Sequence, residues 1–404
     1  MQKSAKDVRP ASPTGRLIPA ILAAWLLGGA TLHATPYIPG DDSEVLEHVL
    51  PNTDHRMQDI RKLAALIAQS PGDENRALTL ASRQLALGVA ESDPRFVGYA
   101  QGTLAPWWHG SDPSIPLQVL RARILQAQHN FTSAKQDLEQ VLHKDPNYVE
   151  AHLVLAGVDE ATGDLGPASQ HCAEAGRIRP SLAAIACAAS VDSVSGYADR
   201  AYASLTLATS RARSKDPVLQ SWALTVLAEI EDRRNDPGAG QHFTDALAQH
   251  PNDVYILTAY ADYLLAHDRA ADVSRLLAGK ERIDALLLRL AIAARDTGDS
   301  RLPDYIVALA DRYTAAQALG QSLHLRDESR FELDLRGNSS RALELARQNW
   351  AVQRTPLDAR IYLAAAQAAS SGSDIKIVAK FVADTRLEDF RLQDLATRQT
   401  AAAQ

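Results

Sequence analysis

The chain has 404 residues, of which 46% are hydrophobic and only 5% aromatic, and its formal net charge is −7. The charge is spread along the chain and no basic stripe occurs, so a nucleic-acid partner is not expected. Two cysteines are too few to hold together a chain of this length. Its stability must therefore come from the packing of Ala-rich and Leu-rich segments.

The first 34 residues have the pattern of an export signal. Basic residues between Lys3 and Arg16 precede an uncharged run from Leu17 to Leu32, and this order is typical of secretory signals. The run is shorter than the roughly 20 residues that span a bilayer, which favours cleavage; a retained anchor is the alternative. We therefore expect an exported, periplasmic protein, or one held in the inner membrane by residues 17–32 with its repeats in the periplasm.

Helical periodicity begins after an extended lead at residues 35–56. Apolar residues recur at helical spacing over residues 60–67 and 78–85, and a third helix is expected over residues 96–105. These segments predict amphipathic helices that pack side by side.

Two adjacent tryptophans, Trp107 and Trp108, lie between Pro106 and Gly110. Neighbouring residues of a helix cannot both face one side, so at least one ring lies at a surface or seals an edge. One hypothesis is an aromatic contact for a partner or a glycan. We favour the other, a plug that covers the apolar edge of the unit that follows.

From Ile115 to Leu182 one pattern occurs twice with a period of 34 residues. The recurring pairs are Ala122 and Ala156, Ala134 and Ala168, and Pro146 and Pro180. Each copy reads as helix, turn, helix and stop, and a period of this size marks a repeat array. Weaker copies continue to Thr385, and the charged run that follows suits a polar helix that terminates the array.

The pattern resembles the tetratricopeptide repeat, which has a small residue in its first helix, Gly at the turn, Ala in its second helix and Pro at its end. In the second copy these features are carried by Leu155–Ala156, Gly163, Ala168, Ala175 and Pro180. The resemblance implies an all-α fold, an α-solenoid of antiparallel helix pairs that form a right-handed superhelix. The expected parts are an export signal or anchor (1–34), an extended lead (35–56), the repeat array (57–386), and a C-terminal capping helix and tail (387–404).

The resemblance also implies a binding row, because the first helix of each tetratricopeptide repeat lines a concave groove for peptides. Carried onto this chain, the row comprises Arg123, Gln126, Glu150, Glu160, Ser190, Ser193, Glu231, Asp232, Tyr255 and Asp262. The row is mostly acidic, which favours a basic or polar partner segment; the alternative is a set of solvated helix faces. The family's clamp for C-terminal carboxylates uses Lys, Arg and Asn, and only Arg123 matches it.

No catalytic or cofactor motif occurs, so neither enzymatic activity nor a cofactor is expected. The densest group of histidines is His129, His143, His152 and His171. They are expected on different helices and faces, which favours solvated side chains over a metal site.

The two cysteines are expected on neighbouring helices, Cys172 in the second helix of one repeat and Cys187 in the first helix of the next. A disulfide requires their α-carbons to lie within about 7 Å. The repeat frame places Cys187 off the main packing row, so two buried thiols are favoured over the bond.

The sequence thus predicts a non-enzymatic scaffold of the bacterial envelope that binds a protein or peptide partner in the groove of its repeats. One alternative is an accessory subunit of a transporter or synthase, anchored through residues 17–32. The other is an enzyme or glycan binder that uses Trp107 and Trp108.

Overall fold

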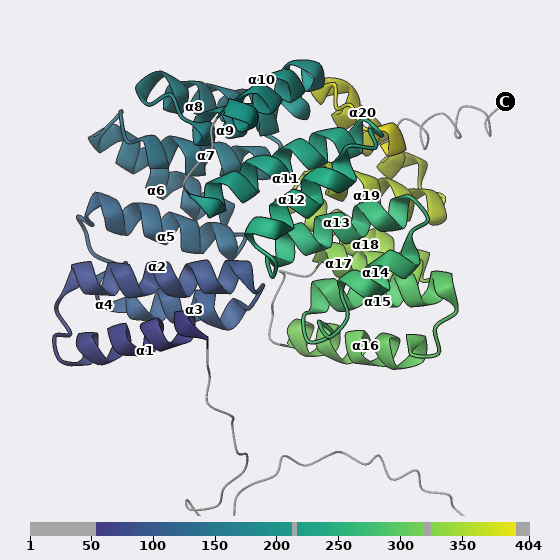
Figure 1. The fold of residues 1–404 in the computed structure, drawn as a ribbon, viewed down its shortest axis with the longest axis horizontal. Helices are drawn as coiled ribbons and strands as arrows, with labels where there is room; N and C mark the ends of the chain where they lie inside the picture. The colour runs from purple at the N-terminus through teal and green to yellow at the C-terminus, as the bar shows by residue number, and fades with distance from the viewer. Residues whose placement is uncertain (1–53, 212–215, 319–324, 393–404) are drawn as a thin grey trace, which may run out of the picture. The chain divides into compact units, whose positions relative to one another are not determined.

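The computed structural model describes residues 54–211, 216–318 and 325–392. Within these ranges the chain forms helices and no strand, which confirms the all-α prediction (Figure 1). In chain order the helices are α1 (His55–Ala68), α2 (Glu74–Ala90), α3 (Pro94–Thr103), α4 (Ala105–Trp108), α5 (Ile115–Ala127), α6 (Phe131–Lys144), α7 (Val149–Thr162), α8 (Leu165–Ile178), α9 (Leu182–Ser193), α10 (Ala198–Arg211), α11 (Pro217–Arg233), α12 (Ala239–Gln249), α13 (Val254–Ala266), α14 (Ala270–Leu276), α15 (Asp284–Thr297), α16 (Leu302–Ala318), α17 (Leu325–Asp334), α18 (Ser339–Val352), α19 (Pro356–Ala368) and α20 (Gly372–Thr385). The expected export signal and most of the lead lie outside the described residues.

Short polar side chains fix where many of the helices begin. Asp54, Asp73 and Asp93 each accept a hydrogen bond from a backbone N–H in the first turn of α1, α2 and α3. Ser114 and Asp253 do the same for α5 and α13. These N–H groups have no partner within the helix, so the caps stabilise the helix starts. The helix boundaries are therefore encoded locally in the sequence.

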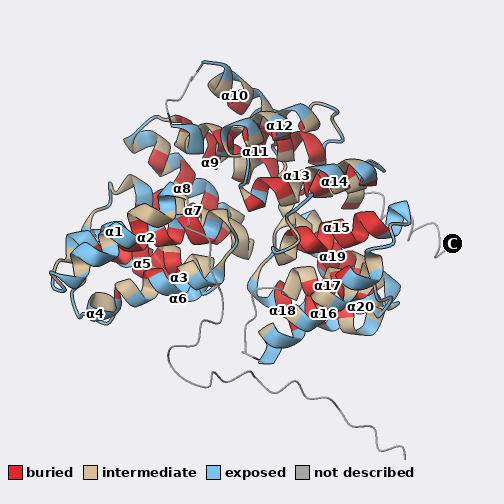
Figure 2. Ribbon diagram, turned by 60° about the horizontal axis from the view of Figure 1, so that its bottom comes forward, coloured by how far each residue is buried: buried red, intermediate tan, exposed pale blue. Residues whose placement is uncertain are grey.

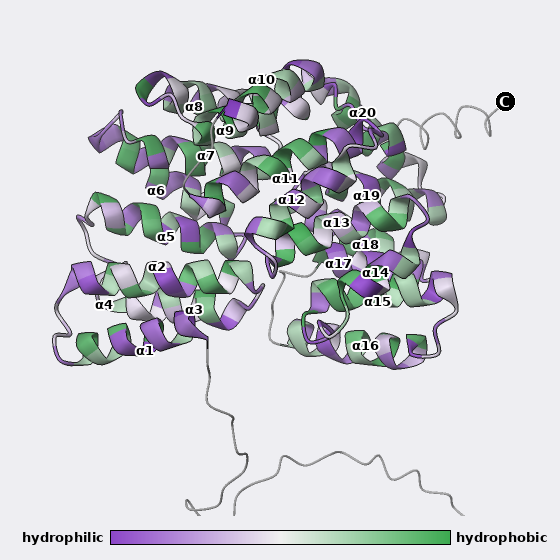
Figure 3. Ribbon diagram, in the orientation of Figure 1, coloured by the Kyte–Doolittle hydropathy of each residue, from purple (hydrophilic) through white to green (hydrophobic). Residues whose placement is uncertain are grey.

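Small residues let the two helices of a repeat approach each other closely. Ala122, Ala134, Ala156 and Ala168 are all at most 1% exposed. Interaxial distance depends on the side chains at the contact, and Ala permits a short one. Buried residues are concentrated where helices face each other (Figure 2), and each helix carries both apolar and polar residues (Figure 3). The 34-residue period thus reflects this repeated helix-to-helix contact.

The array from α5 onward is built in two layers. Each odd-numbered helix packs against the even-numbered helix that follows it and against the next odd-numbered helix, from α5 and α7 to α17 and α19. The odd-numbered helices therefore form a continuous inner layer, and the even-numbered helices form the outer layer of an α-solenoid wound as a right-handed superhelix. We call the side of the odd-numbered helices that faces away from the outer layer the inner face.

The last repeats pack back onto the repeat formed by α7 and α8. The backbone N–H of Arg354 donates to the carbonyl of Ala161, with an N–O distance of 2.8 Å. Gly163 ends α7 in the left-handed conformation, and a Cβ added there would lie 3.2 Å from the Phe381 ring of α20. Residues nearly 200 positions apart are thus in contact, so this solenoid closes on itself.

The segment after α20 takes part in the same closure. Leu387 and Leu392 are buried in the core shared by α18, α19 and α20, and the Arg386 guanidinium lies over the Tyr197 ring. Two leucines of the expected capping helix at residues 387–404 thus contribute to the core, and the chain is helical again at residues 390–392; the capping role stays a prediction. The rest of that stretch lies outside the described residues.

The prediction of two buried thiols is also wrong. A disulfide joins Cys172 of α8 to Cys187 of α9, and their α-carbons lie 5.6 Å apart. Both cysteines are buried in one cluster with Ala168 and Val191. The repeat alignment placed Cys187 off the row of residues that contacts Cys172. Because α9 packs directly on α8, Cys187 nevertheless reaches Cys172.

Candidate partner-binding surface

Side-chain hydrogen bonds connect consecutive odd-numbered helices along the inner face. The Ser190 hydroxyl of α9 donates to Glu160 of α7 over 2.7 Å. The Tyr255 hydroxyl of α13 donates to Glu229 of α11 over 2.5 Å. Glu160, Ser190 and Tyr255 belong to the predicted row, and these bonds place them on facing helices.

The first members of the predicted row lie near the start of the array. Arg123 of α5 donates to Glu150 of α7 over 3.3 Å, and both side chains are substantially exposed. The Gln126 side chain lies over α7. Ser193 of α9 accepts a hydrogen bond from Arg233 of α11 over 2.6 Å. A role for these residues in binding stays a prediction.

Glu231 does not lie on the inner face. Its side chain is 2% exposed, and Nδ1 of His242 in α12 donates to its carboxylate over 2.6 Å. Glu229, two residues earlier, bonds to the neighbouring odd-numbered helix instead. Two residues turn a side chain about 200° around a helix axis. Assigning Glu231 to the groove was therefore wrong, and Glu229 takes its place.

Asp232 is occupied by the chain's own C-terminal segment. Arg391 donates to both carboxylate oxygens of Asp232, with Nη1 at 2.9 Å from Oδ2. A nitrogen of Arg360 in α19 lies 3.8 Å from the same carboxylate. Asp232 was predicted to face a partner, but the structure gives it an intramolecular one. A partner reaches it only by displacing Arg391.

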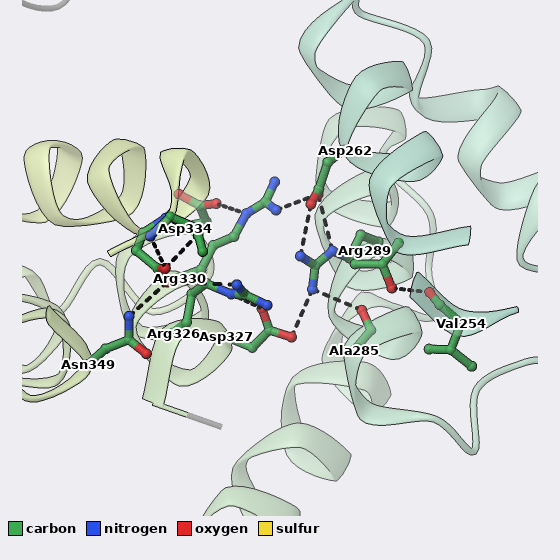
Figure 4. Close-up of polar contacts among 12 residues, drawn as sticks. Val254, Asp262, Ala285, Arg289, Arg326, Asp327, Arg330, Asp334 and Asn349 are labelled. Atoms are coloured by element: carbon green, nitrogen blue, oxygen red, sulfur yellow. Dashed lines mark hydrogen bonds and ion pairs between the residues drawn. The ribbon is translucent and has the colours of Figure 1, made fainter. Parts of the chain in front are cut away.

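Asp262 is held in a buried network of ion pairs (Figure 4). Arg289 of α15 is fully buried and donates to both oxygens of Asp262 and to Asp327 of α17. Arg330 of α17 donates to Asp262 over 2.5 Å and to Asp334 over 3.2 Å. Burial acts to raise the pKa of Asp262, but the charges of Arg289 and Arg330 outweigh it and hold that pKa below its ordinary value. The prediction that Asp262 faces a partner is wrong, because the network holds α13, α15 and α17 together.

Glu160 and Glu229 differ from these paired carboxylates. They accept hydrogen bonds from hydroxyl groups, and within the described residues no ion pair joins either of them to a basic side chain. Burial raises the pKa of Glu160 to about 7 and also raises that of Glu229, while Arg233 opposes both shifts. The charge of Glu229 raises the pKa of Tyr255 well above its ordinary value. Within the described residues these two carboxylates are thus bonded to hydroxyl groups, and the charge of Arg233 acts on both without an ion pair.

Exposed apolar side chains occur on the same helix face as Glu229 and on the next odd-numbered helix. Val218 is 60% and Trp222 40% exposed, and they precede Glu229 on α11 by about three and two helical turns, so the three share one face. The Tyr255 ring on the next odd-numbered helix is 61% exposed. The inner face of α11 thus carries exposed apolar side chains in its first half and Glu229 near its end, where Tyr255 of α13 contacts it.

Comparison with known proteins identifies the repeats. A family model described as the tetratricopeptide repeat matches residues 125–188, within the segment where Ala134 recurs as Ala168. The chain carries tetratricopeptide repeats. None of the curated proteins matches the sequence.

Solved structures of repeat proteins are similar to this chain, and the first of the three that follow supports the fold. A chain of the APC/C hetero-tetramer Cut9–Hcn1 is 13% identical, with a TM-score of 0.51 over 85% of this chain and 66% of that chain. A thermophilic TPR protein of Thermus thermophilus is 21% identical, with a TM-score of 0.34 over 52% of this chain and 99% of that chain. Yeast Tom70 is 13% identical, with a TM-score of 0.41 over 86% of this chain and 85% of that chain. At these identities the likeness concerns the fold.

Tetratricopeptide repeats support a general role in protein–protein interaction. Stacked repeats of this class present an extended concave surface to a partner, and proteins built from them are typically non-catalytic scaffolds. The repeats therefore indicate a protein-binding role, and the chemistry of the surface determines which partner it fits.

The tryptophan pair lies at the start of the tetratricopeptide repeat array. Trp107 and Trp108 form the end of the short helix α4, and both rings pack, partly buried, against the core that includes Leu104 and Leu117. This is the position that a plug over the apolar edge occupies. A role in binding a glycan or partner stays an untested hypothesis.

Two of the four clustered histidines meet, and the other two do not join them. Nδ1 of His152 and Nδ1 of His171 lie 3.0 Å apart, between α7 and α8. His129 stacks on Phe131. Within residues 54–211, 216–318 and 325–392, no group of three or more His, Cys, Asp or Glu side chains could hold a metal ion.

No helix in the described ranges is both long and apolar enough to cross a membrane. The apolar run at residues 17–32 lies outside those ranges, so its role as signal or anchor stays a prediction.

Three residues that shape the inner face of the tetratricopeptide repeats escaped sequence analysis. Glu229 was not predicted because the binding row in α11 was placed two residues further along the helix, at Glu231. Arg289 lies among leucines, where an isolated charge predicts a solvated position. It is nevertheless the largest fully buried side chain of the residues that the structure describes. Arg391 looked like part of a polar cap, and no local signal connects it to a residue 159 positions earlier.

Proposed function

We propose that the chain is an exported, non-enzymatic scaffold that holds a protein partner on the inner face of α7, α9, α11 and α13. The observation that carries this proposal is the combination of exposed Trp222 and Tyr255 with the carboxylates of Glu160 and Glu229, which bond to hydroxyl groups and form no ion pair within the described residues. Large exposed apolar side chains that share a face commonly mark an interaction site.

Two features support export. The first is the sequence pattern of residues 1–34, with basic residues before an apolar run. The second is the disulfide between Cys172 and Cys187, because such bonds persist in oxidising compartments and are rare in the cytosol. Together they favour the bacterial periplasm as the location.

Site-specific photo-crosslinking in the envelope of the native host tests the binding surface. A photoreactive phenylalanine analogue replaces Tyr255 in one variant and Tyr99 of α3 in its control, since the two side chains are 61% and 57% exposed. We expect a defined protein adduct from position 255 and none from position 99. Equal adducts at both positions, or an adduct at position 99 alone, would overturn the assignment of the inner face.

A membrane-tethered accessory subunit is the second candidate, and the uncharged run at residues 17–32 favours it. Sequencing the N-terminus of the protein purified from its host separates the two. A mature chain that starts after residue 28 supports the free scaffold, whereas a chain that starts at Met1 supports the tethered form.

A further inference from the structure

The inner face already shows which chemical group its carboxylates bind. Asp232 receives Arg391, which reaches it from 159 residues away, and Asp262 receives Arg289 and Arg330. In each case the guanidinium group donates hydrogen bonds to a carboxylate that projects from an odd-numbered helix. Charge-assisted pairs of this kind are stronger than neutral hydrogen bonds, so these carboxylates are built to receive cations.

Glu160 and Glu229 are carboxylates of the same layer without such a partner in the described residues. Ser190 and Tyr255 donate to them, and the nearby charge of Arg233 acts on both without forming an ion pair among the described residues. Each carboxylate is close enough for its charge to affect the titration of the other or of Tyr255. A cation placed against both would relieve a repulsion that the free protein carries.

The apolar part of the face restricts the partner further. Trp222 and Val218 occupy the first half of α11 and remain 40% and 60% exposed. The exposed Tyr255 ring beside Glu229 suits a long basic side chain, because the aliphatic stem packs on the ring while the charged end reaches the acid. A neighbouring apolar side chain of the partner would cover the rest of Trp222.

We infer that the inner face of α7, α9, α11 and α13 binds a protein segment that places a Lys or Arg side chain against Glu160 and Glu229 and a large apolar side chain against Trp222. This inference rests on the proposed function and adds the chemistry of the partner. The charge of this binding site is opposite to that of the clamp for C-terminal carboxylates found in the family.

Selection from a displayed library of short random peptides on the full mature chain tests the inference. We expect enriched peptides to share one basic residue at a fixed distance from a large apolar residue. The double variant Glu160→Gln and Glu229→Gln should bind such a peptide at least roughly tenfold more weakly. The control variant Glu139→Gln, on the outer helix α6, should bind it unchanged.

The pH dependence of peptide binding gives an independent measurement. Because burial raises the pKa of Glu160 to about 7, affinity for the basic peptide should fall as the pH decreases through that value. Ser190, Glu229 and Arg233 act on the titration of Glu160, and the charge of Glu160 acts on Tyr255. The loss should disappear in the double glutamine variant, and circular dichroism of each variant checks that the helices are intact.

The outcomes separate this inference from the proposed function. Enrichment of acidic peptides, of peptides recognised by their C-terminal carboxylate, or of none at all overturns the inference, as does a double variant that binds normally. If crosslinking at position 255 still captures a defined partner in that case, the scaffold proposal stands alone. If position 255 captures nothing, both fail.

Discussion

Replacing Arg289 by Met should destabilise the middle of the array by about 3 kcal/mol. Arg289 is fully buried and bonds to both Asp262 and Asp327. Removing one partner of a buried ion pair costs about 3–5 kcal/mol, because the other charge is left without compensation. Here Asp262 keeps Arg330, whereas Asp327 keeps only Arg326 with a closest approach of 3.9 Å. Because only Asp327 loses its main partner, we expect a loss of stability at the lower end of this range.

Hydrogen exchange in the native state is the suitable assay. Repeat arrays can lose all-or-none cooperativity, so a single unfolding curve does not locate the change. We expect amides of α13 to α17 to exchange faster in the variant while those of α1 to α4 stay as they are. The control is Arg177→Ala on α8, whose exposed pair with Glu174 should contribute about 0.5 kcal/mol or less.

A second substitution sharpens the test. Adding Asp327→Asn to the Arg289→Met variant should restore part of the lost stability, because it removes the stranded charge. The reasoning is refuted if Arg289→Met costs less than about 1 kcal/mol, the range of an exposed pair. It is equally refuted if the double variant is less stable than the single one.

Three further predictions concern other parts of the array. Reduction of the bond between Cys172 and Cys187 should lower the free energy of unfolding by about 3 kcal/mol for their separation of 15 residues, and urea denaturation of a Cys172→Ser variant should then not respond to reductant. The hydrogen bond to Glu231 raises the pKa of His242, so its contribution should be complete below the unfolded pKa of about 6.5 and be lost as pH rises through the folded value. Denaturation of a His242→Asn variant across that pH range should lack this component, and a retained component would contradict the assignment. Gly163→Ala should cost about 1–2 kcal/mol because its φ is +84°, and a neutral result in the same denaturation assay would show that the last turn of α7 adapts.

The fold could be predicted because its determinants are local and repeated. Ala122 and Ala134 mark a close contact between two helices, and the same residues return 34 positions later as Ala156 and Ala168. Capping residues such as Ser114 identify the residue at which a helix begins. Because these contacts join only neighbouring helices, the sequence pattern predicts them without knowledge of the path of the whole chain.

The candidate site was predicted only in part, because it depends on helix phase and on contacts between distant residues. Glu160 and Tyr255 were found because their repeats follow the frame. Glu231 was predicted in place of Glu229 because α11 is long, with 17 residues. In a helix of that length an error of two residues in the repeat register assigns the binding row to the wrong face. Asp232 was predicted as open because its partner, Arg391, lies 159 positions later in the chain.

The contact between the last repeats and α7 limits how the array can change in length. An open solenoid tolerates the gain or loss of a repeat, because each repeat touches only its neighbours. Here Arg354 must meet Ala161, and Arg391 must meet Asp232. One additional repeat between them would move these pairs apart by a full repeat. The number of repeats between α7 and α20 is therefore fixed by geometry, much as a closed barrel fixes its number of strands.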